Sequence, residues 1–206
     1  MNGSLLEVLK RLKALSDTGL LYSNNDYDKE RYQELREISL GLLQQISGHS
    51  LDELAESFPL VKEYPTAKVD IRALVLSPEG RILMARESAD GRWSLPGGWA
   101  DVGHTPGETV IKEVFEETGL EVVPQRLLAV FDKRKHPHPP QPFYVYKLLF
   151  YCTAVTSGIR KGFDVLDVDW FEIDQLPELS EDRILKSQIE LGYKKVKSAD
   201  LETYFD

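Results

Sequence analysis

The sequence predicts an α+β protein with a small all-helical domain at its N-terminus. Three observations support this prediction: roughly the first sixty residues carry helical periodicity without a strand pattern, a period of two replaces it afterwards, and one well-delimited helix then interrupts the strand patterns. We expect a helical domain over residues 1–62 and an α+β domain over residues 66–206, with the segment VKEYPTAK as the linker.

The N-terminal segment contains three helical patterns. The first, SLLEVLKRLKALSD, is expected to close between Asp17 and Gly19. The second is DYDKERYQELREISLGLLQQISG, and the third, SLDELAESFP, begins with a capping box formed by Ser50 and Glu53. Apolar residues of the second pattern recur on one side of the predicted helix: Tyr32, Leu35, Ile38, Leu42 and Ile46.

The rest of the chain is dominated by strand patterns. KVDIRALVLSPEGRILMARES contains two β-type runs around the turn SPEG and predicts a hairpin. Further strands are expected in EVVPQRLLAVFDK, PFYVYKLLFYCTAV and VLDVDWFEI, and a closing helix in SEDRILKSQIELGYKKV.

Composition narrows the functional classes. The 206 residues are 42% apolar, enough for a full core, yet no apolar run approaches the roughly 18 residues that span a bilayer, so we expect a cytoplasmic protein without a membrane partner. The net charge of −9, and seven basic minus ten acidic residues (−3) within 1–62, argue against a nucleic-acid partner. The single cysteine, Cys152, lies in an apolar run and is expected to pack as a small hydrophobe.

One helix is delimited by clear signals at both ends. Thr105 is an N-cap, Pro106 occupies the first helical position, and Glu108 completes a capping box. Gly119 provides the C-terminal stop. These signals predict a helix over about residues 106–117.

Three carboxylates, Glu113, Glu116 and Glu117, share one face near the end of this helix. Like charges at such spacings cost about 0.2–0.5 kcal/mol each, and the negative end of the helix dipole adds to the cost. A divalent cation would turn this repulsion into a binding site. A solvated acidic face is the alternative, and on the helix alone it is the better interpretation; the preceding stretch RWSLPGGWADVGHTPGE reverses that judgement.

The segment GWADVGHTPGETVIKEVFEETGL, residues 98–120, resembles the Nudix box, whose family pattern is G-x5-E-x7-R-E-U-x-E-E-x-G-U with U an apolar residue. The positions in register are Gly98, Glu113, Val114, Glu116, Glu117, Gly119 and Leu120. His104 stands in place of the first Glu of the pattern, and Lys112 in place of its Arg. In the family those two residues are associated and help to orient the carboxylates, so the resemblance implies a site whose support is rearranged.

The resemblance extends beyond the box. VDWFEIDQLPEL is similar to the strand and turn that close many Nudix domains, and YSNNDYDKERYQELREI resembles the helical N-terminal domain of a bacterial subgroup associated with ADP-ribose or CDP-choline. The resemblance implies a Nudix-type α/β/α sandwich with a mixed sheet behind a helical domain. Because Nudix enzymes commonly pair, and the helices need a partner for their apolar face, we expect a homodimer built partly by residues 1–62.

The resemblance also implies a metal site and catalytic residues. Glu116 and Glu117 match the metal ligands of the box, and the backbone carbonyl of Gly97 is a family-like third ligand. Glu113 would act through a second ion or a water, or would help to take a proton. The expected cofactor is Mg²⁺, with Mn²⁺ as a substitute. Many Nudix enzymes take their general base from a later loop, which makes Asp164 in KGFDVLD a candidate; a polar loop end is the alternative.

Substrate contacts are predicted less sharply. The cations nearest the box in sequence are Arg72, Arg86 and Arg92, and ordinary surface charge is the alternative for each. His136 and His138 lie in the loop KRKHPHPPQPF, whose positive charge suits a phosphate; an ordinary polar connection is the alternative.

Three functions compete at this stage. The first is a Mg²⁺-dependent pyrophosphohydrolase that splits a nucleoside diphosphate linked to a group X into a nucleoside monophosphate and phospho-X, with ADP-ribose the first expectation for the substrate and CDP-choline the second. The second is a non-catalytic nucleotide-binding sensor on the same fold. The third keeps the enzyme but gives it a nucleoside triphosphate or an RNA 5′ end as substrate.

Overall fold

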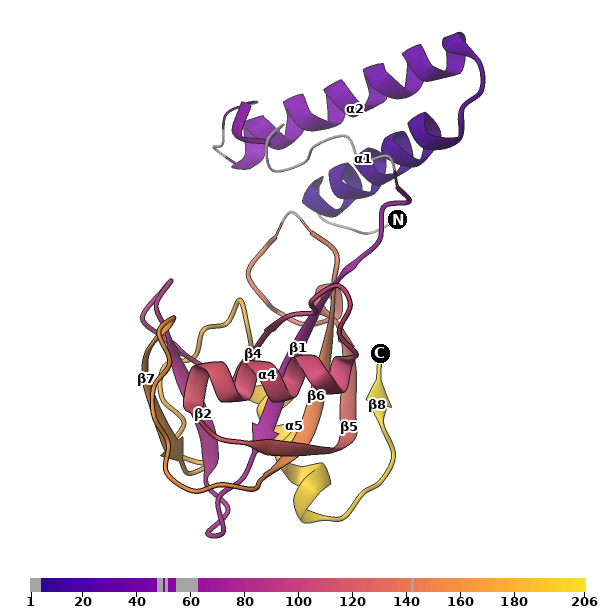
Figure 1. Ribbon diagram of the computed structural model, residues 1–206. Helices are drawn as coiled ribbons and strands as arrows, with labels where there is room; N and C mark the ends of the chain where they lie inside the picture. Colours follow the sequence, from indigo (N-terminus) through magenta and orange to yellow (C-terminus); the bar gives the residue numbers. More distant parts are fainter. Residues whose placement is uncertain (1–4, 48–49, 51, 55–62, 142) are drawn as a thin grey trace. The chain divides into compact units, whose positions relative to one another are not determined.

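The computed structural model of the chain describes residues 5–47, 50, 52–54, 63–141 and 143–206 (Figure 1). Its contacts divide the chain into two compact units, Met1–Ala67 with Pro140–Phe143, and Lys68–Pro139 with Tyr144–Asp206. Each unit has a hydrophobic core of its own.

The first unit is built on α1 (Leu5–Tyr22) and α2 (Asp26–Ser47). Its core is formed by Leu9, Leu40, Leu43 and Leu54. The predicted capping box is present, because the Ser50 amide donates to Glu53 Oε2 at 2.7 Å and the Glu53 amide donates to Ser50 Oγ at 3.2 Å. The remainder of the third predicted helix lies outside the described residues.

The predicted end of α1 is wrong, since the helix continues through Asp17 and Gly19 to Tyr22. Asp17 is buried and lies 2.5 Å from Lys13 Nζ and 3.1 Å from Arg36 Nε of α2. These ion pairs satisfy an aspartate that would otherwise favour a turn, and the helix can continue past it.

Part of the apolar stripe predicted on α2 faces outward. Leu35, Ile38, Leu42 and Ile46 are between 37% and 47% exposed. Their neighbours Leu40 and Leu43 supply the core instead. Among the described helices, none has a long enough apolar stretch to cross a membrane.

The second unit carries the remaining elements: β1 (Lys68–Val75), β2 (Ile82–Glu87), β3 (Trp93–Ser94), β4 (Gly97–Trp99), α4 (Pro106–Thr118), β5 (Val122–Asp132), η1 (Lys133–Lys135), β6 (Val145–Ala154), β7 (Val165–Phe171), α5 (Lys186–Lys197) and β8 (Tyr204–Phe205). The described strands form two sheets with the orders β4-β1-β6-β5-β8 and β3-β2-β7. The first sheet is mixed, because β1 pairs in parallel with β6 and antiparallel with β4. The predicted α+β class with a mixed sheet is confirmed.

The predicted hairpin between residues 68 and 88 is wrong. The strands β1 and β2 lie in different sheets and are joined only by an isolated bridge between Leu76 and Ile82 among the described residues. Both edges of β1 are already paired, with β4 and β6, so β2 has no free edge of β1 to pair with and joins β7 instead.

Helices cover the first sheet on both sides (Figure 1). On one side α4 packs Val110 and Val114 against Ile71 and Ala73 of β1. On the other side α5 contributes Ile189 to a core shared with the second sheet. Cys152 is buried in the α4 core, where burial raises the pKa of its thiol to about 12, as suits a packed residue.

Candidate active site

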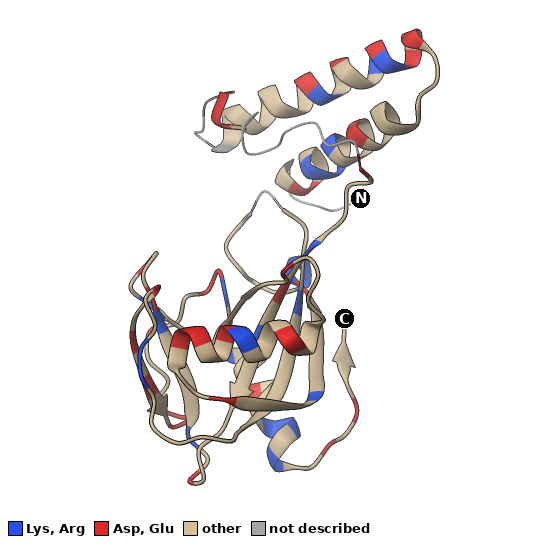
Figure 2. Ribbon diagram, in the orientation of Figure 1, with Lys and Arg blue, Asp and Glu red and all other residues tan. Residues whose placement is uncertain are grey.

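The glutamates are positioned by α4, whose ends agree with the prediction to within a residue. The Glu108 amide donates to Thr105 Oγ1 at 3.2 Å, and the Thr105 amide donates to Glu108 Oε2 at 2.8 Å. At the other end Gly119 adopts a left-handed conformation with φ of 71° and donates its N–H to the Phe115 carbonyl. Figure 2 shows the acidic residues of this helix and the single lysine among them, Lys112.

Two of the three glutamates turn toward the interior. Glu117 is only 5% exposed, and its Oε2 accepts a hydrogen bond from the Gly97 amide at 3.1 Å. Glu113 is half-buried beside Gly98, where an added Cβ would lie 2.8 Å from Glu113 Oε2. Glu116 is exposed. The structure therefore brings Gly97, Glu113 and Glu117 together and leaves Glu116 at the rim.

Gly97 cannot be replaced without disturbing this arrangement. Its φ is 144°, and a Cβ there would lie 2.0 Å from the carbonyl oxygen of Ile71 on the neighbouring strand. Only glycine allows β4 to approach β1 so closely while its amide still points at Glu117.

The buried carboxylates are short of positive charge. Burial raises the pKa of Glu117 to about 8; Arg72 opposes the shift, whereas Glu87 and Glu113 add to it. Burial also raises the pKa of Glu113, with Lys112 opposing and Glu116 adding. A divalent cation would supply the missing charge and allow these groups to ionise.

The donor set suits Mg²⁺, which prefers oxygen ligands and keeps several of its own waters, so that it needs few protein groups. Glu113, Glu117 and the Gly97 backbone supply such oxygens in one place. In the described part of the chain, however, no three Asp, Glu, His or Cys side chains are gathered closely enough to hold a metal as they stand. Glu116 is engaged elsewhere, because its Oε2 lies 3.1 Å from Lys112 Nζ.

The two departures from the family pattern meet at a residue that the sequence did not single out. Lys112 Nζ lies 3.1 Å from Asp101 Oδ2, and His104 Nδ1 lies 3.6 Å from the same oxygen. Hydrogen bonding to Lys112 lowers the pKa of Asp101. Asp101 thus provides the carboxylate for Lys112 that position 104 lacks.

We predict that Asp101→Asn weakens metal binding, because Lys112 then has Glu116 as its remaining ion-pair partner and competes more strongly with the metal for that carboxylate. These side chains are exposed, and exposed ion pairs are weak, so we expect only about a 1.5- to 5-fold loss of Mn²⁺ affinity. Electron paramagnetic resonance of bound Mn²⁺ measures this loss. His104→Glu in the Asp101→Asn background should restore affinity, whereas Glu172→Gln, an exposed control, should change nothing. Unchanged affinity in Asp101→Asn would show that the contact is incidental.

Asp164 follows a loop that runs beside the C-terminal end of α4. Its loop is fastened to the end of α4, because the Arg160 amide donates to the Thr118 carbonyl and the Gly162 amide to the Glu117 carbonyl, both at 2.8 Å. A Cβ at Gly162 would lie 1.9 Å from the Glu116 carbonyl, so this approach requires glycine. Asp164 is exposed; burial raises the pKa of Glu87, and the charge of Asp164 adds a small part to that shift.

Arg72 lies inside the domain with its donors occupied. Its Nε and Nη2 donate to Asp70 at 3.1 and 2.9 Å, and its Nη1 donates to Ser94 Oγ at 3.2 Å. Lys147 also donates to Asp70, and all three charged side chains are buried. This placement suits support of the neighbouring Glu117 better than direct contact with a substrate.

The other predicted substrate residues have partners of their own. Arg86 Nε donates to the Gly91 carbonyl at 2.7 Å, and Arg92 Nε lies 2.9 Å from Glu178 Oε1. His136 Nε2 lies 3.1 Å from Asp206, and His138 Nδ1 lies 2.5 Å from the Glu181 carbonyl oxygen. Burial lowers the pKa of His138 to about 4, so its ring is neutral at pH 7. No contact described in the structure joins these four residues to the glutamates of α4.

Two further charged residues lie beside the site without having been predicted. Glu87 is buried at the end of β2, with its Oε1 3.0 Å from Arg183 Nε and 3.5 Å from Arg72 Nη1. The pairing register between β2 and β7 shifts between Arg86 and Glu87. Such an irregularity changes the direction in which a side chain such as that of Glu87 points, and simple alternation along a strand does not predict the change.

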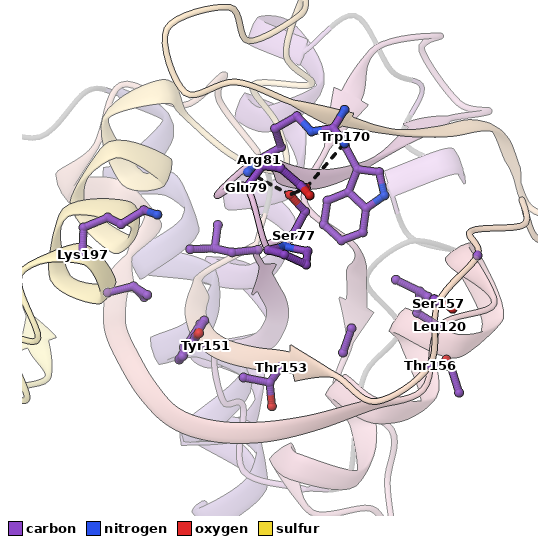
Figure 3. Close-up of a pocket in the computed structure, with 15 residues that line it drawn as sticks. Ser77, Glu79, Arg81, Leu120, Tyr151, Thr153, Thr156, Ser157, Trp170 and Lys197 are labelled. Carbon is purple, nitrogen blue, oxygen red and sulfur yellow. Dashed lines mark hydrogen bonds and ion pairs between the residues drawn. The ribbon is translucent and has the colours of Figure 1, made fainter.

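A separate cavity of about 580 Å³ lies away from these residues (Figure 3). Its walls are the turn from Leu76 to Arg81, Leu120, the end of β6, Trp170 and Lys197. None of the glutamates of α4 lines it.

Two family models match the chain. The NUDIX domain matches residues 66–190, and a domain described as UDP-X-like, N-terminal oligomerisation domain matches residues 4–58. Between them they account for both parts of the sequence.

Two relatives are similar over nearly the whole chain, and a third over about two thirds of it. A protein of Bacillus subtilis (strain 168), named provisionally as ADP-ribose pyrophosphatase YjhB, is 38% identical over 201 residues, which are 98% of this chain and 96% of that protein. A crystal structure of a UDP-X diphosphatase is 36% identical, with a TM-score of 0.63 and coverage of 98% of this chain and 97% of that one. An ADP-ribose pyrophosphatase from Streptococcus suis 89-1591 is 35% identical, with a TM-score of 0.62 over 68% of this chain and all of its own.

Proposed function

The chain belongs to the Nudix hydrolase family, and we propose that it is a divalent-metal-dependent pyrophosphohydrolase that splits a nucleoside diphosphate linked to a group X into a nucleoside monophosphate and phospho-X. The proposal rests on the pair Glu113 and Glu117, which lie beside the glycines of β4. The cations around these two carboxylates do not neutralise their negative charge fully. Glu116 completes the carboxylate set at the rim.

Hydrolysis adds one water across the diphosphate. The water oxygen bonds to one phosphorus, the bridging P–O bond to that phosphorus breaks, and its electron pair stays on the departing phosphate. Glu113, Glu116, Glu117 and the Gly97 carbonyl would hold Mg²⁺, which would withdraw charge from the phosphate oxygens and lower the pKa of water. The chain's own task is to accept a proton from the water, and we assign it to Asp164 or Glu113.

We take ADP-ribose as the first candidate substrate and CDP-choline as the second. Relatives over most of the chain are named as ADP-ribose pyrophosphatases, which supports the first choice. The name UDP-X diphosphatase on another relative adds UDP-linked compounds to the candidates. Each of these compounds offers the same diphosphate and differs in the groups at its ends.

The test is a hydrolysis panel with Mg²⁺ or Mn²⁺ over ADP-ribose, CDP-choline, UDP-sugars, dinucleoside polyphosphates and nucleoside triphosphates. We expect metal-dependent turnover of a diphosphate-linked compound to a nucleoside monophosphate, abolished by chelator, with ¹⁸O from labelled water found in one product. Turnover of triphosphates alone would overturn the proposed substrate class. Tight binding without turnover would favour the non-catalytic sensor instead.

We further infer that the enzyme is a homodimer built partly by α1 and α2. The four outward residues of the α2 stripe are large and apolar, and such a row in a small helical unit is a surface that a partner would cover. The match of residues 4–58 to an oligomerisation domain supports the inference. A second copy of the chain is the simplest partner because it presents the same stripe.

Deleting residues 1–62 is expected to give a monomeric or insoluble protein, because the pairing surface is lost. Light scattering coupled to size exclusion measures the mass. In the full chain, Ile38→Glu should also dissociate the dimer, whereas its neighbour Glu37→Gln should leave the mass unchanged. A soluble, active dimer without residues 1–62 would refute the inference.

A further inference from the structure

We propose that Arg183 binds a phosphate of the substrate and that Glu87 is the positioning residue that aims it. The proposal rests on the proposed function, since it assigns the cation that meets the diphosphate. None of the three arginines expected to contact the substrate is well placed for this: Arg72 is buried with its donors occupied, and Arg86 and Arg92 contact Gly91 and Glu178 instead of the glutamates.

The backbone at Arg183 is rigidly fixed. The amides of Arg183 and Ile184 both donate to the Ser180 carbonyl, at 2.8 and 2.9 Å, and close a tight turn. The Ser180 amide donates to the Trp93 carbonyl at 2.8 Å, which ties the turn to β3, and Ile184 is buried in the core. A side chain that starts from such a turn has little freedom in where it reaches.

The guanidinium has three polar neighbours. Its Nε lies 3.0 Å from Glu87 Oε1, and its Nη1 donates to Ser180 Oγ at 3.0 Å. Asp90 Oδ2 lies 3.8 Å from the same Nη1. The side chain is 28% exposed, so part of the guanidinium remains accessible from outside. Arg183 therefore combines a fixed backbone with an accessible cationic group.

Glu87 links Arg183 to the catalytic carboxylates. It is buried, lies 3.5 Å from Arg72 Nη1, and its charge acts on Glu117. Asp164 acts on Glu87 in turn. Arg183 thus stands at the edge of the same cluster of carboxylates that would hold the metal.

A diphosphate placed at this cluster needs cations as well as metal. Arginine donates paired N–H groups to phosphate oxygens in a fixed fork, which a lysine or a hydroxyl does not reproduce. Because the hydrogen bond to Ser180 and the ion pair with Glu87 restrict the guanidinium before substrate arrives, less freedom is lost on binding.

The test compares Arg183→Gln with Arg81→Gln, a matched control on a partly exposed arginine that pairs with Glu79. We expect KM for the hydrolysed substrate to rise about tenfold to a hundredfold in Arg183→Gln, with a smaller change in kcat, and no change in the control. Affinity for the nucleoside monophosphate product without metal, measured calorimetrically, should fall in parallel. Arg183→Lys should recover part of the loss, and free guanidinium should rescue Arg183→Ala.

Glu87→Gln should raise KM by a smaller factor, and in the double variant with Arg183→Gln it should add little, because it acts through Arg183. A lower melting temperature with unchanged KM and product affinity in Arg183→Gln would overturn the proposal and leave a structural ion pair. If the wild type hydrolyses nothing, the proposed function fails. The affinity for the nucleoside monophosphate then tests the role of Arg183 independently of catalysis. Equal affinity in Arg183→Gln and in the wild type would overturn that role.

Discussion

Glu117→Gln is expected to lower kcat about a hundredfold to a thousandfold while the protein stays folded. Glutamine has the same shape and keeps an oxygen to accept from the Gly97 amide, so the packing beside β4 survives. What it removes is the negative charge that would bind the metal. The kcat measured in the steady state and the affinity for Mn²⁺ should fall together, whereas the exposed control Glu172→Gln should match the wild type in both. Full activity in Glu117→Gln would refute the assigned site.

The same variant has a second signature in metal-free protein. The folded pKa of Glu117 is about 8, above the ordinary value of a glutamate, so between those values the folded state holds a proton that the unfolded state has released. Stability of the wild type should therefore fall as pH rises toward 8, and Glu117→Gln should lack this part of the decline. Melting temperatures in chelator from pH 5 to 9 measure the difference; parallel curves would contradict the assigned pKa.

The second large effect is expected in Asp70→Asn. Burial alone would raise the pKa of Asp70, but Arg72 and Lys147 outweigh it and hold the pKa at about 2. The variant leaves these two cations, 5% and 3% exposed, without their carboxylate. Removing one partner of such a buried cluster costs about 3–5 kcal/mol. Denaturant unfolding should show a loss of this size, together with lower activity because Arg72 also faces Glu117.

Two comparisons sharpen this prediction. Asp169→Asn, on the exposed side of β7, should change the free energy of unfolding little. Adding Lys147→Met to Asp70→Asn should recover part of the stability, because one uncompensated charge is removed. A loss below about 1 kcal/mol in Asp70→Asn would mean that water or another group compensates the buried cations.

Local signals in the sequence predicted α4 well. Thr105, Glu108 and Gly119 act on backbone groups a few residues away, and each makes the contact that its type and spacing indicate. The hairpin between β1 and β2 failed because strand pairing is not local: β1 pairs with β6, which lies 77 residues further along the chain. A turn such as SPEG shows where the chain reverses but not which sheet the following strand joins.

The same distinction between local and long-range contacts applies to the candidate site. The glutamates and Gly97 could be identified because they belong to one continuous motif. Arg72 was misleading, since KVDIRALV alternates polar and apolar residues as an exposed strand does, yet Asp70 and Arg72 satisfy each other in the interior. Glu87 and Arg183 were invisible for a related reason, because their contact joins β2 to a turn almost a hundred residues later.

The position of β1 also bears on how the protein is made. A ribosome releases the helical unit first and then β1, β4 and α4, but the edge of β1 that pairs with β6 stays open until residues 145–154 emerge. An open strand edge is a template for pairing with another chain. Until β6 is synthesised, α4 packs on an incomplete sheet. Nascent chains stalled before residue 145 should therefore be inactive, and they should depend on a chaperone more than longer chains do.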